Sequence, residues 1–138
     1  MEQTEIPAAE WESYCAGFSR AHHGWLVTLA TVPTAQLQAE PEQATEHWRI
    51  IVDKVRLQRL ELDAARGRCG IATDTPSGGA LVEHRLDGIS ALFMLSVGGA
   101  HQGLRIDSLA NQEQESALIW FRAPAAPEEL DGIADFEM

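Results

Sequence analysis

Basic residues are scarce in this chain of 138 residues. Ten lysines and arginines stand against 21 aspartates and glutamates, which gives a formal net charge of −11. A surface of this sign repels phosphate backbones and anionic headgroups, so we expect no nucleic acid and no membrane among the partners. The acids gather at both ends of the chain and in residues 40–46, a distribution that indicates solubility more than a recognition patch.

Long hydrophobic runs and a secretory leader are also lacking. No apolar stretch reaches the roughly 20 residues that a membrane-spanning helix needs. The acidic segment Met1–Glu10 has neither the basic start nor the apolar centre of a signal peptide. There are two cysteines, Cys15 and Cys69, too few for a disulfide framework. These features predict a cytoplasmic protein with reduced thiols.

The common catalytic motifs are missing as well. The sequence contains no Gly-x-Ser-x-Gly, His-Glu-x-x-His or Cys-x-x-Cys motif, and no glycine loop ending in Lys-Ser or Lys-Thr. The glycine-rich segment 98–103 precedes a strand pattern rather than a helix, so we interpret it as a loop between strands and not as a phosphate site. We therefore predict no cofactor and no metal.

One amphipathic helix is predicted over Pro7–His23. Its apolar stripe recurs at i, i+3, i+4 and i+7, and consists of Trp11, Tyr14, Cys15 and Phe18. Proline suits the first helical turn, and Gly24 supplies a left-handed stop at the other end. The lone thiol on the stripe is expected to be a small core residue.

The rest of the pattern predicts short strands. Residues 25–32 are apolar on both faces, which is typical of a central strand. Further strands are expected at 69–73, 81–86, 89–97, 104–108 and 117–122. Turn signals separate them at 64–68, Pro76–Gly79 and Asp87-Gly88, and the last of these predicts a tight hairpin.

Residues 47–63 fit two descriptions. Trp48, Ile51, Val52 and Val55 fit one face of a helix, whereas alternation at even positions and then at odd positions fits a strand. A bulge near Leu57 reconciles the two strand phases, because one extra residue reverses which side chains face the core. The β-branched residues at 50–52 favour the strand.

These elements predict an α+β fold in a single domain of residues 1–138. The N-terminal helix packs on an antiparallel sheet of six or seven strands, because hairpin-linked strands without crossover helices must pair antiparallel. We expect the sheet to curl into a barrel or roll, which would remove its exposed edges. Residues 33–46 form a polar loop insertion, and residues 124–138 form an acidic C-terminal tail.

Few side chains stand out as candidate catalytic groups. His22 and His23 lie near the end of the predicted helix, where imidazoles interact with the helix dipole. Either could act as a general base if folding brought a carboxylate such as Asp131 beside it. Cys69 follows two arginines, which could lower the pKa of its thiol, although no base lies next to it in sequence.

Two blocks of the sequence resemble a family of small bacterial proteins known as a domain of unknown function. The blocks consist of Ile6-Pro7, Glu10-Trp11, Phe18-Ser19-Arg20 and His23–Thr28 near the start, and of Leu104–Ser108, Trp120–Arg122 and Pro127–Gly132 near the end. The segment 33–63 between them matches poorly. The resemblance implies a single compact bacterial domain, and it carries no activity, cofactor or catalytic residue to this chain.

Three functions remain open from the sequence. The leading hypothesis is a non-enzymatic protein-interaction or accessory module that binds another protein or forms a dimer through a sheet edge. The first alternative is a barrel that binds a small molecule in an apolar pocket lined by Trp11, Trp25, Trp48 or Trp120. The second is a hydrolytic or isomerising enzyme that uses a histidine–carboxylate pair.

Overall fold

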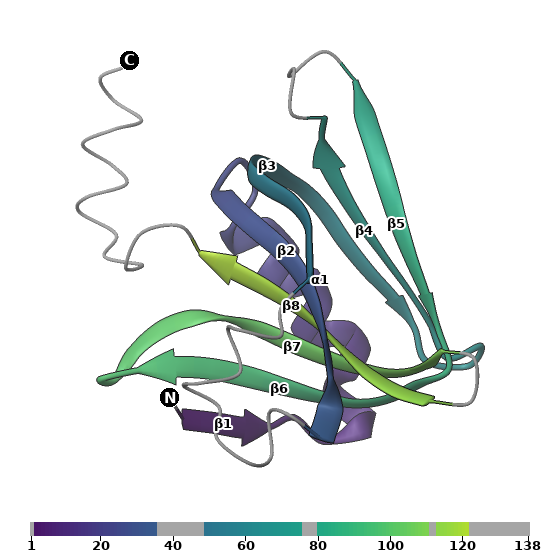
Figure 1. Cartoon of the computed structure of the whole chain (residues 1–138). Helices are drawn as coiled ribbons and strands as arrows, with labels where there is room; N and C mark the ends of the chain where they lie inside the picture. The colour runs from purple at the N-terminus through teal and green to yellow at the C-terminus, as the bar shows by residue number, and fades with distance from the viewer. Residues whose placement is uncertain (1, 36–48, 76–79, 111–112, 122–138) are drawn as a thin grey trace.

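The computed structural model describes residues 2–35, 49–75, 80–110 and 113–121, which form one α-helix and eight strands (Figure 1). A 3₁₀ turn at Ala8–Glu10 leads into helix α1 at Trp11–Ala21. The strands are β1 (Glu2–Glu5), β2 (Leu26–Pro33), β3 (Arg49–Asp63), β4 (Arg68–Asp74), β5 (Leu81–Asp87), β6 (Ile89–Val97), β7 (Ala100–Ala110) and β8 (Glu113–Phe121).

The strands form one antiparallel sheet in the order β1-β6-β7-β8-β2-β3-β4-β5. β2 lies between β8 and β3, which confirms that the apolar segment after the helix is a central strand. In Figure 1, β4 and β5 rise away from β6 and β7, so the sheet has two arms that meet near the end of β5. α1 lies against one face of the sheet and packs mainly on β3. We call the face that carries α1 the inner face.

The α+β prediction is confirmed, but the strand count and the closed barrel are wrong. The described residues form eight strands, and β1 and β5 remain as the two edges of an open sheet. The unexpected strand is β1, whose residues Glu2-Gln3-Thr4-Glu5 show no apolar alternation; contacts distant in sequence, above all its pairing with β6, order it. Closure would require the edge strands β1 and β5 to pair, but in the described part of the chain β1 pairs only with β6 and β5 only with β4.

The two-residue hairpin turn also lies elsewhere than expected. Asp87-Gly88 does not close a hairpin, because β5 pairs with β4 while β6 pairs with β1 and β7. Gly88, at φ +70°, instead turns the chain from one arm to the other. The hairpin turn is Gly98-Gly99, at φ +59° and +84°, where Val97 pairs with Ala100. Two successive positive φ angles suit the turn geometry that matches strand twist.

Helix α1 is shorter than the predicted span, although its inner stripe is correct. Cys15 and Phe18 are buried, and the Trp11 indole donates to the Ile6 carbonyl at 2.9 Å. Gly24 has φ +86° and its N–H donates to the Leu57 carbonyl at 2.7 Å, so the left-handed stop also attaches the helix exit to β3. No helix in the described part of the chain is long and apolar enough to cross a membrane.

β3 is a long, irregular strand, so of the two descriptions of residues 47–63 the bulged strand is correct and the helix is not. Its register against β4 shifts between Leu57 and Arg59, which confirms the predicted bulge. Two further shifts occur against β2, and Lys54 adopts a positive φ of 57°. These irregularities bend the strand, as bulges do, and the bend allows β3 to follow both arms of the sheet.

Several expectations lie outside the described residues or at their border. β2 runs to Pro33 and the described chain stops at Ala35, so most of the polar insertion 33–46 lies outside it. The same holds for Trp48, the turn Pro76–Gly79 and the tail 124–138.

Gly103 offers a test of the close contact between β7 and β8. A Cβ built at this glycine would lie 2.0 Å from the Ile119 carbonyl oxygen, a backbone atom that cannot rotate away. We expect Gly103→Ala to lower the free energy of unfolding by about 3 kcal/mol, as overpacking does. Gly17→Ala is the control, because only the mobile Arg20 guanidinium lies within 4.0 Å of its Cβ. It should raise the stability by up to about 1 kcal/mol. Equal urea midpoints for the two variants would show that the close approach of β7 to β8 does not require glycine.

Candidate functional site

His22 lies in a cluster of aromatic rings at the end of α1. The ring is 4.4 Å from Phe18, 4.4 Å from Trp25 and 4.8 Å from Phe121, measured between centroids. Its Nδ1 donates to the Phe18 carbonyl at 2.9 Å, and the residue is only 8% exposed. Burial lowers the pKa of His22, against the opposing effect of the hydrogen bond to the Phe18 carbonyl. The fold therefore holds this imidazole neutral.

The partner that folding brings to His22 is a second histidine. The His101 ring, on β7, lies 5.3 Å from the His22 ring, and its Nε2 donates to the Gly103 carbonyl at 3.2 Å. Burial lowers the pKa of His101 too. A ring that donates through one nitrogen while neutral keeps the other nitrogen as an acceptor. Nothing in the spacing of the two residues along the chain indicates this contact.

The predicted histidine–carboxylate pair is not assembled among the described residues. His23 is exposed next to the buried His22, as adjacent positions on a helix end require. Asp131 lies outside the described residues, so its pairing with either histidine stays a prediction.

The buried histidine pair makes stability depend on pH. Below the ordinary histidine pKa of about 6.5, the two histidines become protonated in the unfolded chain but stay neutral in the folded chain. The free energy of unfolding therefore falls as the pH decreases. Each such histidine contributes a slope of at most about 1.4 kcal/mol per pH unit. His22→Phe keeps an aromatic ring in the cluster and removes one titrating group. We expect its stability to fall less steeply than that of the wild type between about pH 7.5 and 5.5.

The matched control for this measurement is His23→Gln, at the exposed neighbouring position. Urea unfolding at a series of pH values should give this variant the wild-type slope. If the free energy of unfolding of His22→Phe depended on pH as steeply as that of the wild type, the cluster would not lower the pKa of His22.

Both cysteines are free thiols with the properties of core residues. Cys15 is 0% exposed and Cys69 is 1% exposed. Burial raises the pKa of each thiol to about 12, so the thiolate needed for nucleophilic attack is scarce at neutral pH. The arginines that precede Cys69 do not activate it, because Arg66 pairs with Asp63 at 3.8 Å and Arg68 pairs with Asp87 at 3.3 Å.

A cleft of about 530 Å³ occupies the inner face of the sheet beyond α1. None of the residues that line it belongs to the helix. Its floor is apolar, and includes Leu29, Ile71, Leu86 and Ala117. Its polar residues come from five strands, and include Thr31, Arg49, His84, Ser108 and Glu115. We call this site the inner cleft.

The position of the inner cleft follows from how three strands end. Side chains two residues apart point to the same face of a strand. On the inner face Leu29 is therefore followed by Thr31, Ile106 by Ser108, and Glu115 precedes Ala117. Leu29, Ile106 and Ala117 belong to the core cluster beneath α1. The inner face thus changes from apolar to polar at the same end of neighbouring strands.

The charged groups of the inner cleft are incompletely paired. Asp87 pairs with Arg68, outside the cleft. Within the described part of the chain, neither Arg49 nor Arg85 forms an ion pair, and Glu115 forms none either. Two unpaired cations against one unpaired anion favour a ligand with negative charge.

His84 is the titratable ring in the cleft wall. Its Nε2 lies 3.2 Å from the hydroxyl of Thr73, which is 0% exposed, and burial lowers the pKa of the imidazole. A neutral ring beside a hydroxyl can donate or accept one hydrogen bond. The described residues contain no group of three or more histidines, cysteines and acids that could hold a metal ion.

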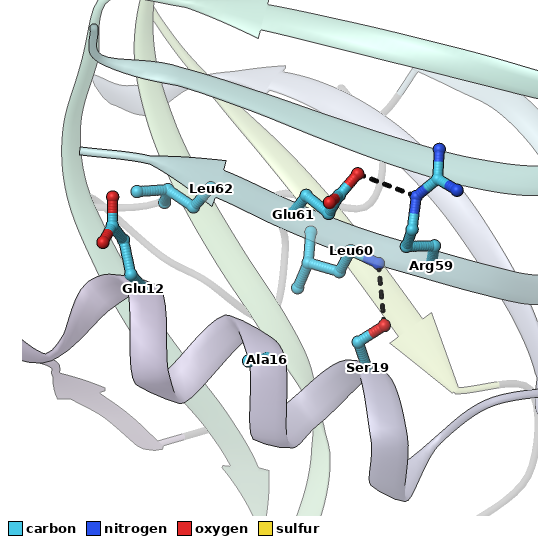
Figure 2. Close-up of a pocket in the computed structure, with 7 residues that line it drawn as sticks. All are labelled: Glu12, Ala16, Ser19, Arg59, Leu60, Glu61 and Leu62. Carbon is cyan, nitrogen blue, oxygen red and sulfur yellow. Dashed lines mark hydrogen bonds and ion pairs between the residues drawn. The ribbon is translucent and has the colours of Figure 1, made fainter. Parts of the chain in front are cut away.

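A second groove, of about 340 Å³, lies between α1 and β3 (Figure 2). Its polar groups fix the helix to the strand: the Ser19 hydroxyl accepts the Leu60 N–H at 3.0 Å, and the Glu12 carboxylate accepts the Ala64 N–H at 2.8 Å. Arg59 and Glu61 pair with each other at 2.8 Å. Because these groups already have partners, the groove is a packing seam rather than a binding site.

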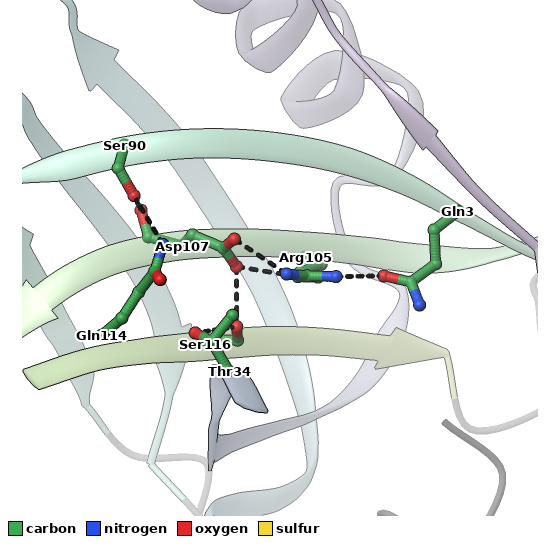
Figure 3. A network of polar contacts seen from close by, with 7 residues as sticks. All are labelled: Gln3, Thr34, Ser90, Arg105, Asp107, Gln114 and Ser116. Carbon is green, nitrogen blue, oxygen red and sulfur yellow. Dashed lines mark hydrogen bonds and ion pairs between the residues drawn. The ribbon is translucent and has the colours of Figure 1, made fainter. Parts of the chain in front are cut away.

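The outer face of the sheet carries a buried ion pair on β7 (Figure 3). The Arg105 guanidinium donates to both oxygens of Asp107, at 2.8 and 2.9 Å, and their side chains are 6% and 3% exposed. Asp107 also accepts from Ser116 at 2.6 Å, and Arg105 donates to Gln3 of β1. The Arg105 guanidinium lies 4.3 Å from the centre of the Phe93 ring. These contacts give the network a structural role.

The ion pair predicts a strong asymmetry between single and double variants. Asp107→Leu leaves the Arg105 charge buried without its counter-ion, so we expect a loss of about 3–5 kcal/mol in the free energy of unfolding. The double variant Arg105→Met with Asp107→Leu removes both charges and should lose less. Urea unfolding measures both, and a double variant less stable than the single one would contradict this role.

Comparison of the chain with protein-family models, with curated proteins and with solved structures found no match. The resemblance of the terminal blocks to a bacterial family therefore stays a prediction.

Proposed function

We propose that the protein binds a small amphipathic molecule with an anionic group in the inner cleft. The observation that carries this proposal is the coincidence of an apolar floor with two unpaired arginines, Arg49 and Arg85, in a hollow of about 530 Å³. Pockets for small ligands typically measure about 300–1,000 Å³ and combine an apolar lining with a few polar groups.

The contacts of His84 support binding rather than catalysis. A general base needs a group that orients it and stabilises its protonated form, and a carboxylate is the usual choice. The neighbour that His84 contacts is the Thr73 hydroxyl at 3.2 Å, which cannot supply that charge.

The tryptophan lining that the sequence predicted for a small-molecule pocket is not part of this proposal. Trp11, Trp25 and Trp120 are half-buried, and none of them lines the inner cleft. The apolar contact surface comes instead from aliphatic side chains.

Octanoate and octanol, a carboxylate and an alcohol with chains of the same length, test the proposal. Titrated into the ¹⁵N-labelled protein, octanoate should shift amide resonances of residues that line the cleft, at Thr31, Arg49, His84 and Ser108. Octanol lacks the charge that the arginines recognise, so it should bind more weakly. Octanoate shifts confined to other regions, or absent at saturation, would refute the site.

Arg49→Glu tests the role of the unpaired cation. The side chain is exposed, so reversing its charge should leave the fold intact. We expect octanoate to bind about tenfold more weakly, which corresponds to about 1.4 kcal/mol for a lost charge-assisted contact. Arg56→Glu is the control: Arg56 is also exposed and lies on β3, but it does not line the cleft. Equal weakening in both variants would mean that net charge, and not the cleft, attracts the carboxylate.

A further inference from the structure

The two edges of the open sheet differ in charge pattern. An unpaired edge exposes backbone N–H and C=O groups that can pair with another strand. β1 carries two charged residues, Glu2 and Glu5, and both are acidic, so no self-pairing of this strand brings opposite charges together. β5 alternates charges of opposite sign: Glu83, Arg85 and Asp87. The edge formed by β5 is therefore the one that can match a copy of itself.

The register of β5 against β4 shows which of its backbone groups are free. Thr75 N–H donates to the Ala80 carbonyl at 3.0 Å, and the same register continues through Val82, opposite Thr73, and His84, opposite Ile71. Hydrogen-bonded positions alternate along an antiparallel pair. Even-numbered residues of β5 therefore bond to β4, and the odd-numbered residues direct their N–H and C=O groups to the open edge. Among the described residues no backbone hydrogen bond joins that edge to another strand.

We propose that β5 pairs with β5 of a second copy of the chain, antiparallel and centred on His84, to form a dimer. In this register all seven residues of the strand find a partner. Glu83 lies opposite the Arg85 position of the copy, and Val82 lies opposite its Leu86 position. The odd-numbered residues then face one another with their free backbone groups, as a hydrogen-bonded ladder requires.

Other registers are less favourable for a physical reason. A centre on Glu83 places two glutamates opposite each other, and a centre on Arg85 places two arginines opposite each other. A centre between two residues would set free backbone groups against groups that already bond to β4. A centre on Leu86 also sets Arg85 opposite Asp87, but it pairs only residues 85–87. The centre on His84 pairs all seven residues, and Asp87, which then lies opposite Leu81 of the copy, keeps its ion pair with Arg68 of its own chain.

Exposed apolar surface supports the same contact. Leu81 is 58% exposed and Val82 is 36% exposed, at the start of β5. Pairing would cover both residues. A contact of one strand is small for a protein interface, so we expect a reversible dimer rather than an obligate one.

Charge reversal provides the first test. Glu83 and Arg85 are exposed, and Glu83 loses only a surface ion pair with Arg59 at 3.4 Å, so E83R and R85E should both fold. Each variant places like charges in both cross-strand pairs, and we expect its dimer dissociation constant in sedimentation equilibrium to rise about tenfold. The double variant E83R/R85E restores opposite charges and should dimerise like the wild type. An equimolar mixture of the two single variants should also associate, because every cross-strand pair then joins a base to an acid.

A cysteine at the centre of the strand provides the second test. Residues opposite each other at a non-hydrogen-bonded position have Cα atoms about 4.5 Å apart, which lies within the range of about 4.4–6.8 Å that a disulfide spans. His84→Cys should therefore form an intermolecular disulfide on mild oxidation, whereas Val82→Cys should not, since Val82 does not face its own copy. The native cysteines do not compete, because both are buried.

Association alone decides the proposal; because His84 and Arg85 also line the inner cleft, octanoate binding is tested on the wild type and the Arg49 and Arg56 variants, which leave β5 unchanged. A wild type that stays monomeric at the highest concentration reached, or His84→Cys that links no faster than Val82→Cys, would overturn the pairing. Dimers that persist equally in all charge variants would place the interface elsewhere. The dimer could fail while octanoate still binds, and the reverse is equally possible, so failure of one proposal is distinguishable from failure of the other.

Discussion

The packing of α1 on β3 is the contact on which the rest of the domain depends. With 11 residues, the helix is about 16 Å long at 1.5 Å per residue. With 15 residues, β3 extends over about 50 Å at 3.3 Å per residue. A helix of this length covers only part of the inner face, and that part is the apolar core around Leu60 and Leu62. The inner cleft is the part that the helix does not reach.

The sheet is open, so each of its two edge strands exposes backbone groups on one side. A closed barrel would leave no free strand edge, but the bulges of β3 and the turn at Gly88 set the two arms at an angle and leave one edge of β1 and one edge of β5 without a neighbouring strand. β1 is protected by its acidity. It is also attached to the sheet by Gln3, which accepts a hydrogen bond from the buried Arg105. No described strand covers the free edge of β5, and in the proposed dimer its alternating charges would match those of a second copy.

The elements that could be predicted from the sequence are those whose signal is local. The stripe of α1, the left-handed Gly24 and the bulged β3 each follow from residues close together in the chain. β1 could not be predicted, because its polar residues are ordered by contacts distant in sequence, the pairing with β6 and the hydrogen bond from Arg105 to Gln3. The hairpin predicted at Asp87-Gly88 was wrong for the same reason. The dipeptide indicates a turn, but tertiary packing decides whether the two strands that flank it pair with each other. The contact between His22 and His101 has no sequence signal at all.

The sequence contains a pattern that indicates the inner cleft, but the pattern can be recognised only when the order of the strands in the sheet is known. Thr31, Ser108 and Glu115 each lie on the same face as a core residue two positions away, which in one strand alone looks like ordinary fraying of the apolar pattern. Once β7, β8 and β2 are known to be neighbours, the three changes coincide at one end of the sheet. A dimer through β5 would extend this arrangement. The symmetry axis of antiparallel strands paired at a shared residue runs perpendicular to the sheet, so the inner faces of both copies point the same way. Because His84 lies both at that axis and in the cleft wall, the clefts of two paired copies would open side by side on one face of a continuous sheet.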